Sequence, residues 1–216
     1  MYLNDFSVRI PEGLEIPGGY VEVQHCQRYR LVLGNRHSVR CDARVEIDGK
    51  HVGTWRIEPN GSITLERPVH DTGHFTFYQV GTKEAMQAAL DSNDPNLGLV
   101  KVTFTPEKRQ EWVAPTNTYW IRSDQPWEYV LQYSSENPRG IKEITSCYAM
   151  MNSGPTSRAG GTGLSGTSNQ KFSDASCIVY DYTQQTVIHL RLIANNENEG
   201  PRPLTSFSTQ VPPRIY

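Results

Sequence analysis

The chain has 216 residues, enough to bury a hydrophobic core in one β-rich domain or two small ones without disulfide staples. Its formal net charge is −2, and no block rich in lysine or arginine stands out, so we expect no nucleic-acid partner. No apolar run is long enough for a signal peptide or a membrane-spanning helix, so we expect neither.

The first segment, residues 1–19, holds two prolines and three glycines without sustained periodicity, which predicts an extended N-terminal arm. Strand candidates then follow at short intervals. Seven segments show alternating or β-branched and aromatic residues, namely 20–24, 28–33, 39–47, 51–57, 62–66, 74–80 and 97–105.

The clearest strand pattern runs over residues 40–66. Ala43, Val45 and Ile47 fall on one face of a strand, while the charged residues between them fall on the other. Asp48-Gly49 and Asn60-Gly61 are strong turn signals, because glycine accepts the positive φ of a tight primed turn. The segment therefore predicts β-hairpins in an antiparallel sheet with one solvated face.

The second half of the chain continues the β pattern after one short helix, expected at 83–90 with Thr82 as its N-cap. Residues 107–127 are rich in proline and tryptophan and form either a linker or an ordered crossover. The last 21 residues, 196–216, hold four prolines and predict an extended C-terminal arm. Further strands are expected at 128–133, 141–150, 176–182 and 186–193.

These elements predict a mainly β fold, an antiparallel β-sandwich of the jelly-roll type over residues 20–195, with one short helix and two extended arms. An alternative arrangement divides the sandwich into two sub-sheets, 20–106 and 128–195, joined by the crossover at 107–127.

A long segment rich in glycine, serine and threonine, residues 152–173, predicts a loop, and loops of such length commonly carry function. Residues 161–166 match the GxGxxG pattern of dinucleotide sites, but the flanking strand and helix that such a site needs are not predicted. We interpret the loop as a binding or assembly element, because its glycines permit close backbone approach. Its candidate residues are Gly161, Gly163, Leu164 and Gly166.

Trp112, Trp120 and Trp127 form a second group of candidate binding or assembly residues. Exposed tryptophan rings would stack against sugar rings and favour a carbohydrate-binding module. Rings packed beneath the crossover would instead be anchors of the core or of an interface, which is the interpretation we favour.

Signals for catalysis or metal binding are weak. Asp71-Thr72-Gly73 resembles the triplet of aspartic proteases, but the surrounding residues favour a type I turn between strands. His70 and His74 have a spacing that suits a metal ion on a helix, and the same turn argues against a helix there. We therefore predict no catalytic residues, no metal site and no cofactor.

The four cysteines, at positions 26, 41, 147 and 177, show no CxxC spacing. We expect them to be buried free thiols, because free cysteine packs like a small hydrophobic residue. A disulfide between Cys26 and Cys41 is the alternative in an oxidising environment.

Three segments, RYRLVLGNRHSVRCDARVEIDGKHVGTWRIEPNGSITLERP, GGTGLSGTSNQKF and TVIHLRL, resemble parts of small β-rich proteins of viruses and bacteria. The resemblance implies a structural or surface role and assigns no functional residues. We expect a non-enzymatic protein that associates with itself or with other structural proteins through its arms and glycine-rich loop. Its expected location is a virion or an extracellular assembly reached without a signal peptide, or otherwise the cytoplasm. A carbohydrate-binding or adhesion module is the alternative, followed by a metal-dependent or aspartic-type hydrolase.

Overall fold

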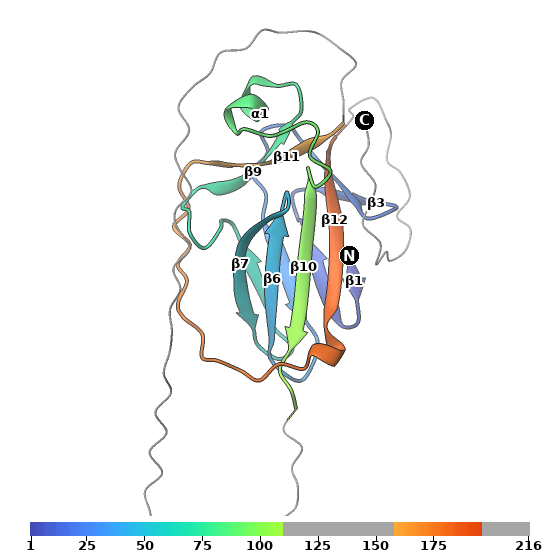
Figure 1. Cartoon of the computed structure of the whole chain (residues 1–216), viewed down its shortest axis with the longest axis vertical. Coiled ribbons are helices and arrows are strands. Elements are labelled where there is room, and N and C mark those ends of the chain that lie inside the picture. The colour runs from blue at the N-terminus through green and yellow to red at the C-terminus, as the bar shows by residue number, and fades with distance from the viewer. Residues whose placement is uncertain (110–157, 196–216) are drawn as a thin grey trace, which may run out of the picture. The chain divides into compact units, whose positions relative to one another are not determined.

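The computed structural model describes residues 1–109 and 158–195, which fold mainly as β-strands, as predicted (Figure 1). In chain order the described elements are β1 (Tyr2–Leu3), β2 (Phe6–Arg9), β3 (Leu14–Ile16), β4 (Tyr20–Val23), β5 (Leu31–Asn35), β6 (Cys41–Ile47), β7 (Lys50–Ile57), β8 (Ser62–Leu65), β9 (His74–Gln79), α1 (Lys83–Gln87), β10 (Leu99–Pro106), β11 (Gly160–Ser165), the 3-10 helix η1 (Tyr182–Gln184) and β12 (Thr186–Ala194).

The strands form two large sheets and one small one. The orders are β1-β2-β5-β8, β3-β4-β12-β10-β6-β7 and β11-β9. Figure 1 shows the small sheet and α1 at one end of the six-stranded sheet. The purely antiparallel prediction needs one correction, because β4 and β12 run parallel. These strands are far apart in the sequence, so no hairpin turn determines their relative direction.

Side chains from both large sheets meet in one hydrophobic core. Phe6 on β2 stacks on Phe104 of β10, with 4.6 Å between ring centroids, and neither ring is exposed to solvent. Burying an aromatic or aliphatic side chain of this size contributes about 1.5–3 kcal/mol. The alternation in β2, β5 and β6 places every second side chain in this core. The sheets are thus held together by apolar contacts across the space between them.

The first predicted hairpin is confirmed and the second is not. Asp48 and Gly49 have φ angles of 50° and 72° and join β6 to its antiparallel neighbour β7. Asn60 also has a positive φ, 53°, but its turn leads from β7 in the six-stranded sheet to β8 in the four-stranded sheet. Four residues, 58–61, could close a hairpin, but β8 pairs with β5 instead, where Leu65 is buried opposite Leu31.

Residues 1–19 do not form the predicted arm, because they contribute β1, β2 and β3 to the two large sheets. Phe6, Val8 and Ile10 are buried, and this alternation is the strand signal that the nearby prolines and glycines obscured. β2 pairs with β5, and β3 pairs with β4. The N-terminal segment is therefore part of the core.

Residues 176–182, predicted as a strand, form no strand ladder. Tyr180 makes a single bridge with Glu107, and η1 begins at Tyr182. Val179 and Tyr182 are 70% and 69% exposed, so the apolar residues here find no buried sheet face. Two backbone hydrogen bonds, from the Lys108 N–H to the Val179 carbonyl and from the Asp181 N–H to the Pro106 carbonyl, hold the segment. The Tyr180 hydroxyl adds a hydrogen bond of 2.6 Å to Asp42.

Some predicted elements lie outside the described residues, so they remain predictions. They are the strands at 128–133 and 141–150, most of the crossover at 107–127, and the C-terminal arm at 196–216. Within the described ranges, β12 lies between β4 and β10, so strands from both ends of the chain share one sheet. No helix in these ranges has the length and apolar character needed to cross a membrane.

Candidate functional site

Six residues of the predicted glycine-rich loop, Gly160–Ser165, form a strand. Gly161, Gly163 and Leu164 lie in β11, which pairs antiparallel with β9, and Gly166 follows the strand with a φ of 60°. The prediction of a loop is therefore wrong for residues 160–165, whereas a binding or assembly role of Gly161, Gly163, Leu164 and Gly166 stays a prediction. Leu164 is 40% exposed, whereas Gly161 and Gly163 are buried.

The glycines of β11 lie directly against aromatic and aliphatic side chains. A Cβ added to Gly163 would lie 2.5 Å from the Tyr78 ring, and one added to Gly160 would lie 2.2 Å from the Phe77 ring. No side chain has space at either position. The role of these glycines is thus close packing of β11 beneath the rings of β9 and beside α1.

The other sequence candidates are not brought together. Trp112, Trp120 and Trp127 lie outside the described residues, so the carbohydrate-platform interpretation stays a prediction. Asp71 accepts a hydrogen bond of 2.7 Å from the Gly73 backbone N–H, which agrees with the predicted turn. His74 lies 3.9 Å from a Glu66 carboxylate oxygen.

The cysteines are only partly as predicted. Cys41 is buried, but Cys26 and Cys177 are exposed, and all three are free. No disulfide joins Cys26 to Cys41. Cys147 lies outside the described residues.

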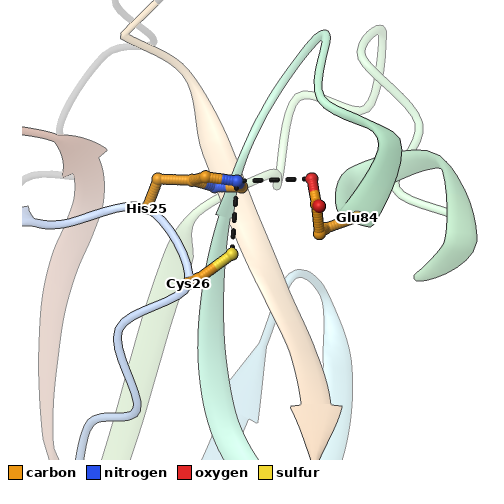
Figure 2. Close-up of side chains that lie close together, drawn as sticks. All are labelled: His25, Cys26 and Glu84. Carbon is orange, nitrogen blue, oxygen red and sulfur yellow. Dashed lines mark hydrogen bonds and ion pairs between the residues drawn. The ribbon is translucent and has the colours of Figure 1, made fainter.

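A cluster that the sequence analysis did not identify consists of His25, Cys26 and Glu84. One ligand atom from each lies within 4.8 Å of the other two. Figure 2 shows the imidazole of His25 between the other two side chains. Its Nε2 lies 3.2 Å from the Cys26 Sγ and 3.4 Å from a Glu84 carboxylate oxygen. We call these three residues the His25 cluster.

The cysteine of this cluster is held in an uncommon backbone conformation. Residues 24–27 form a turn in which the Gln27 N–H donates to the Gln24 carbonyl at 3.1 Å. Cys26 occupies its third position with a φ of 62°, which normally favours glycine or asparagine. The turn is fixed against β9, because the Cys26 N–H donates to the Phe77 carbonyl and the Phe77 N–H donates to the Gln27 carbonyl. The sheet thereby supports a strained residue.

The backbone of Gln79 connects the turn to the helix that carries Glu84. Its N–H donates to Nδ1 of His25 at 3.2 Å, and its carbonyl accepts a hydrogen bond of 2.7 Å from the Thr82 hydroxyl. Thr82 is the N-cap of α1, as predicted, because its hydroxyl also accepts from the Ala85 N–H. Glu84 lies in the first turn of that helix. The backbone of one residue thus positions two members of the cluster.

The hydrogen bond from Gln79 favours one tautomer of the neutral His25 ring. Because Nδ1 accepts from Gln79, we assign the proton of the neutral ring to Nε2, which faces Cys26 and Glu84. Partial desolvation by the neighbouring residues is the larger cause, and the negative charge of Glu84 the smaller, of a raised pKa of the Cys26 thiol. A hydrogen bond from its own backbone N–H and a further one from His25 hold the pKa of Glu84 below its usual range, against the opposing effect of burial.

This arrangement does not activate the thiol as a nucleophile. A base for Cys26 would need a free lone pair at the nearest imidazole nitrogen, and Nε2 carries the proton instead. The raised pKa of the Cys26 thiol also lowers the fraction of reactive thiolate. The three side chains do, however, offer the sulfur, nitrogen and oxygen donors that bind transition metals.

The cluster could hardly be found from the sequence. His25 and Cys26 are neighbours, but Glu84 is remote in the chain and reaches them only through the packing of α1 against the small sheet. The spacing matches no metal-binding pattern. Comparison with models of known families, with curated proteins and with solved structures finds no significant match to this chain.

Proposed function

We propose that the two large sheets form a β-sandwich of the jelly-roll type. The stacking of Phe6 on Phe104 supports this, since it joins the inner faces of the two sheets. The connections support it as well, because the chain passes between the sheets after β2, β4, β5 and β7. Such crossing connections are typical of sandwiches built from Greek keys.

We further propose that the chain is a non-enzymatic structural protein that assembles with copies of itself. The observation that carries this proposal is the edge strand β3, which pairs only with β4 among the described strands. Leu14 on β3 is 47% exposed. An open edge with an exposed apolar side chain can accept a strand from another chain. The N-terminal segment then serves assembly as a sheet edge and not as an arm.

The charge of the chain is compatible with such assembly. A net charge of −2 leaves little electrostatic repulsion between copies. Sandwiches of the jelly-roll type also serve as capsid and lectin domains, and we propose a virion or another extracellular array as the setting.

The substitution Leu14→Lys tests the edge directly, because a charge at an edge strand opposes strand addition. Met86→Lys is the matched control, since Met86 on α1 is exposed to the same extent, 47%. In sedimentation velocity at increasing concentration we expect Leu14→Lys to abolish association and Met86→Lys to leave it unaltered. Equal association of the wild-type chain and both variants would contradict assembly through β3.

A further inference from the structure

Two of the three donor-to-donor distances within the His25 cluster, both measured from the imidazole Nε2, are close to those in a tetrahedral metal site. Zinc binds nitrogen and oxygen at about 2.0–2.2 Å and sulfur at about 2.3 Å, so donors around it lie about 3.4–3.6 Å apart. The imidazole Nε2 is already 3.4 Å from the Glu84 oxygen and 3.2 Å from the Cys26 sulfur. The Cys26 sulfur and the Glu84 oxygen lie within 4.8 Å of each other, so rotation of these two exposed side chains would bring all three donors onto one ion.

The donor types select the class of metal. Calcium and magnesium prefer oxygen ligands, whereas thiolate and imidazole together favour zinc and similar ions. Cys26 and Glu84 are exposed, so solvent can reach the position that three protein ligands leave open. We propose that His25, Cys26 and Glu84 form a zinc site completed by a solvent molecule.

The backbone supports the site more than a chance surface cluster would require. Cys26 keeps a φ of 62° although it carries a side chain, and this conformation places its sulfur beside His25. The Gln79 carbonyl accepts a hydrogen bond from the Thr82 hydroxyl and so holds the N-cap of α1, the helix that carries Glu84. Zinc would therefore link the 24–27 turn to α1.

One hydrogen bond must change on binding. Zinc at Nε2 requires the imidazole proton at Nδ1, so the Gln79 N–H can no longer donate there. The Gln79 N–H and the Nδ1–H would then face each other as two donors, so the ring must turn away from Gln79. The cost of this turn and of one neutral hydrogen bond is small beside the affinity of a thiolate, imidazole and carboxylate set for zinc.

Titration of the metal-free full chain with zinc chloride, in competition with a chromophoric chelator, measures the affinity. We expect one zinc ion per chain, lost in Cys26→Ser and retained in Cys177→Ser, which changes another exposed free cysteine. We expect Glu84→Gln to weaken binding by about tenfold or more, whereas the exposed Glu58→Gln leaves it unchanged.

Cobalt substitution identifies the ligands by spectroscopy. We expect a thiolate-to-cobalt charge-transfer band in the wild-type chain and in Cys177→Ser, and none in Cys26→Ser. A cobalt complex without this band, or equal zinc affinity in the wild-type chain and Cys26→Ser, would overturn the proposal.

Cys26→Gly separates loss of the metal from loss of the fold. Glycine adopts the positive φ of this position without strain, so we expect the metal-free variant to unfold at a higher temperature than the metal-free wild-type chain. We also expect zinc to raise the unfolding temperature of the wild-type chain but not that of this variant. An equal zinc-dependent rise in both proteins would exclude Cys26 as a ligand.

Discussion

Asp42 on β6 is held by side chains from two other parts of the chain. Its carboxylate forms an ion pair with Arg56 on β7 and accepts a hydrogen bond from the Tyr180 hydroxyl. Burial opposes ionisation of Asp42, but the hydrogen bonds from Arg56 and Tyr180 outweigh it and lower its pKa. Arg56 also donates to the Ser176 carbonyl. The network therefore fastens the segment before η1 to the six-stranded sheet.

The lowered pKa makes this contribution dependent on pH. It is fully present above about pH 4, the usual pKa of an unfolded aspartate, and is lost as the pH falls through the folded-state pKa. We expect Asp42→Asn to lower the free energy of unfolding by about 1–3 kcal/mol at pH 7, and this deficit to shrink toward pH 3. Urea denaturation of both proteins across this range measures it.

Tyr180→Phe is the control for this prediction. It removes one hydrogen bond and leaves the ion pair, so we expect a loss of about 1 kcal/mol at pH 7. An Asp42→Asn deficit that grows as the pH falls would show that the carboxylate does not stabilise the fold as described.

The pairing of β9 with β11 shows how an element can depend on its neighbours. β11 contains three glycines, and its partner β9 supplies the aromatic rings that cover two of them, Gly160 and Gly163. We expect Gly163→Val to destabilise the fold by about 1–3 kcal/mol, because the new side chain would overlap the Tyr78 ring and approach Ala88.

Leu164→Val is the matched control on the same strand, since Leu164 is partly exposed. We expect a change of less than about 0.5 kcal/mol there. Thermal and urea unfolding compare the two variants. Similar stability of both would argue against close packing of β11 on β9.

The turn between β6 and β7 has a second structural role beyond reversing the chain. The Asp48 carboxylate accepts the Gly98 N–H at 2.6 Å and the Thr162 N–H at 2.7 Å, joining the turn to β11 and to the residue before β10. Asp48→Asn keeps a residue that suits the turn. Its amide NH2 group, however, would face one of these two N–H donors and cannot accept a hydrogen bond from it.

We therefore expect Asp48→Asn to cost about 1–3 kcal/mol of stability at pH 7, measured by urea denaturation. The reverse exchange at the other turn, Asn60→Asp, should be nearly neutral, because the described part of the chain shows no comparable pair of donors to the Asn60 side chain. A neutral Asp48→Asn would mean that the turn conformation alone matters.

Local patterns were enough to predict much of the β structure. Alternation predicted β6 and β7, the Asp48-Gly49 turn predicted their hairpin, and Thr82 predicted the start of α1. Each of these features depends on residues close together in the chain. Where local signals competed, as with Phe6 and Val8 beside Pro11, the strand was missed.

The remaining features depend on contacts between distant residues. Gly160 and Gly163 of β11 pack against the rings of Phe77 and Tyr78, which are remote in the sequence. Glu84 reaches His25 only through the packing of α1 near the end of β9. The sequence alone contains no signal for such contacts, and so the candidate site could not be predicted.

At the scale of the whole molecule, the described residues form a core of two large sheets with an open edge at β3. Residues 1–19 complete both sheets, so an association mediated by this segment depends on the folded core. The proposed zinc site lies apart from Leu14 in the chain, and its occupancy is tested independently of assembly.

The molar mass of the full chain in solution tests the central proposal most directly. Light scattering coupled to size-exclusion chromatography, over a series of increasing concentrations, should show a mass that rises from 24.4 kDa toward multiples of it. A mass that stays at 24.4 kDa at the highest concentration would contradict self-assembly.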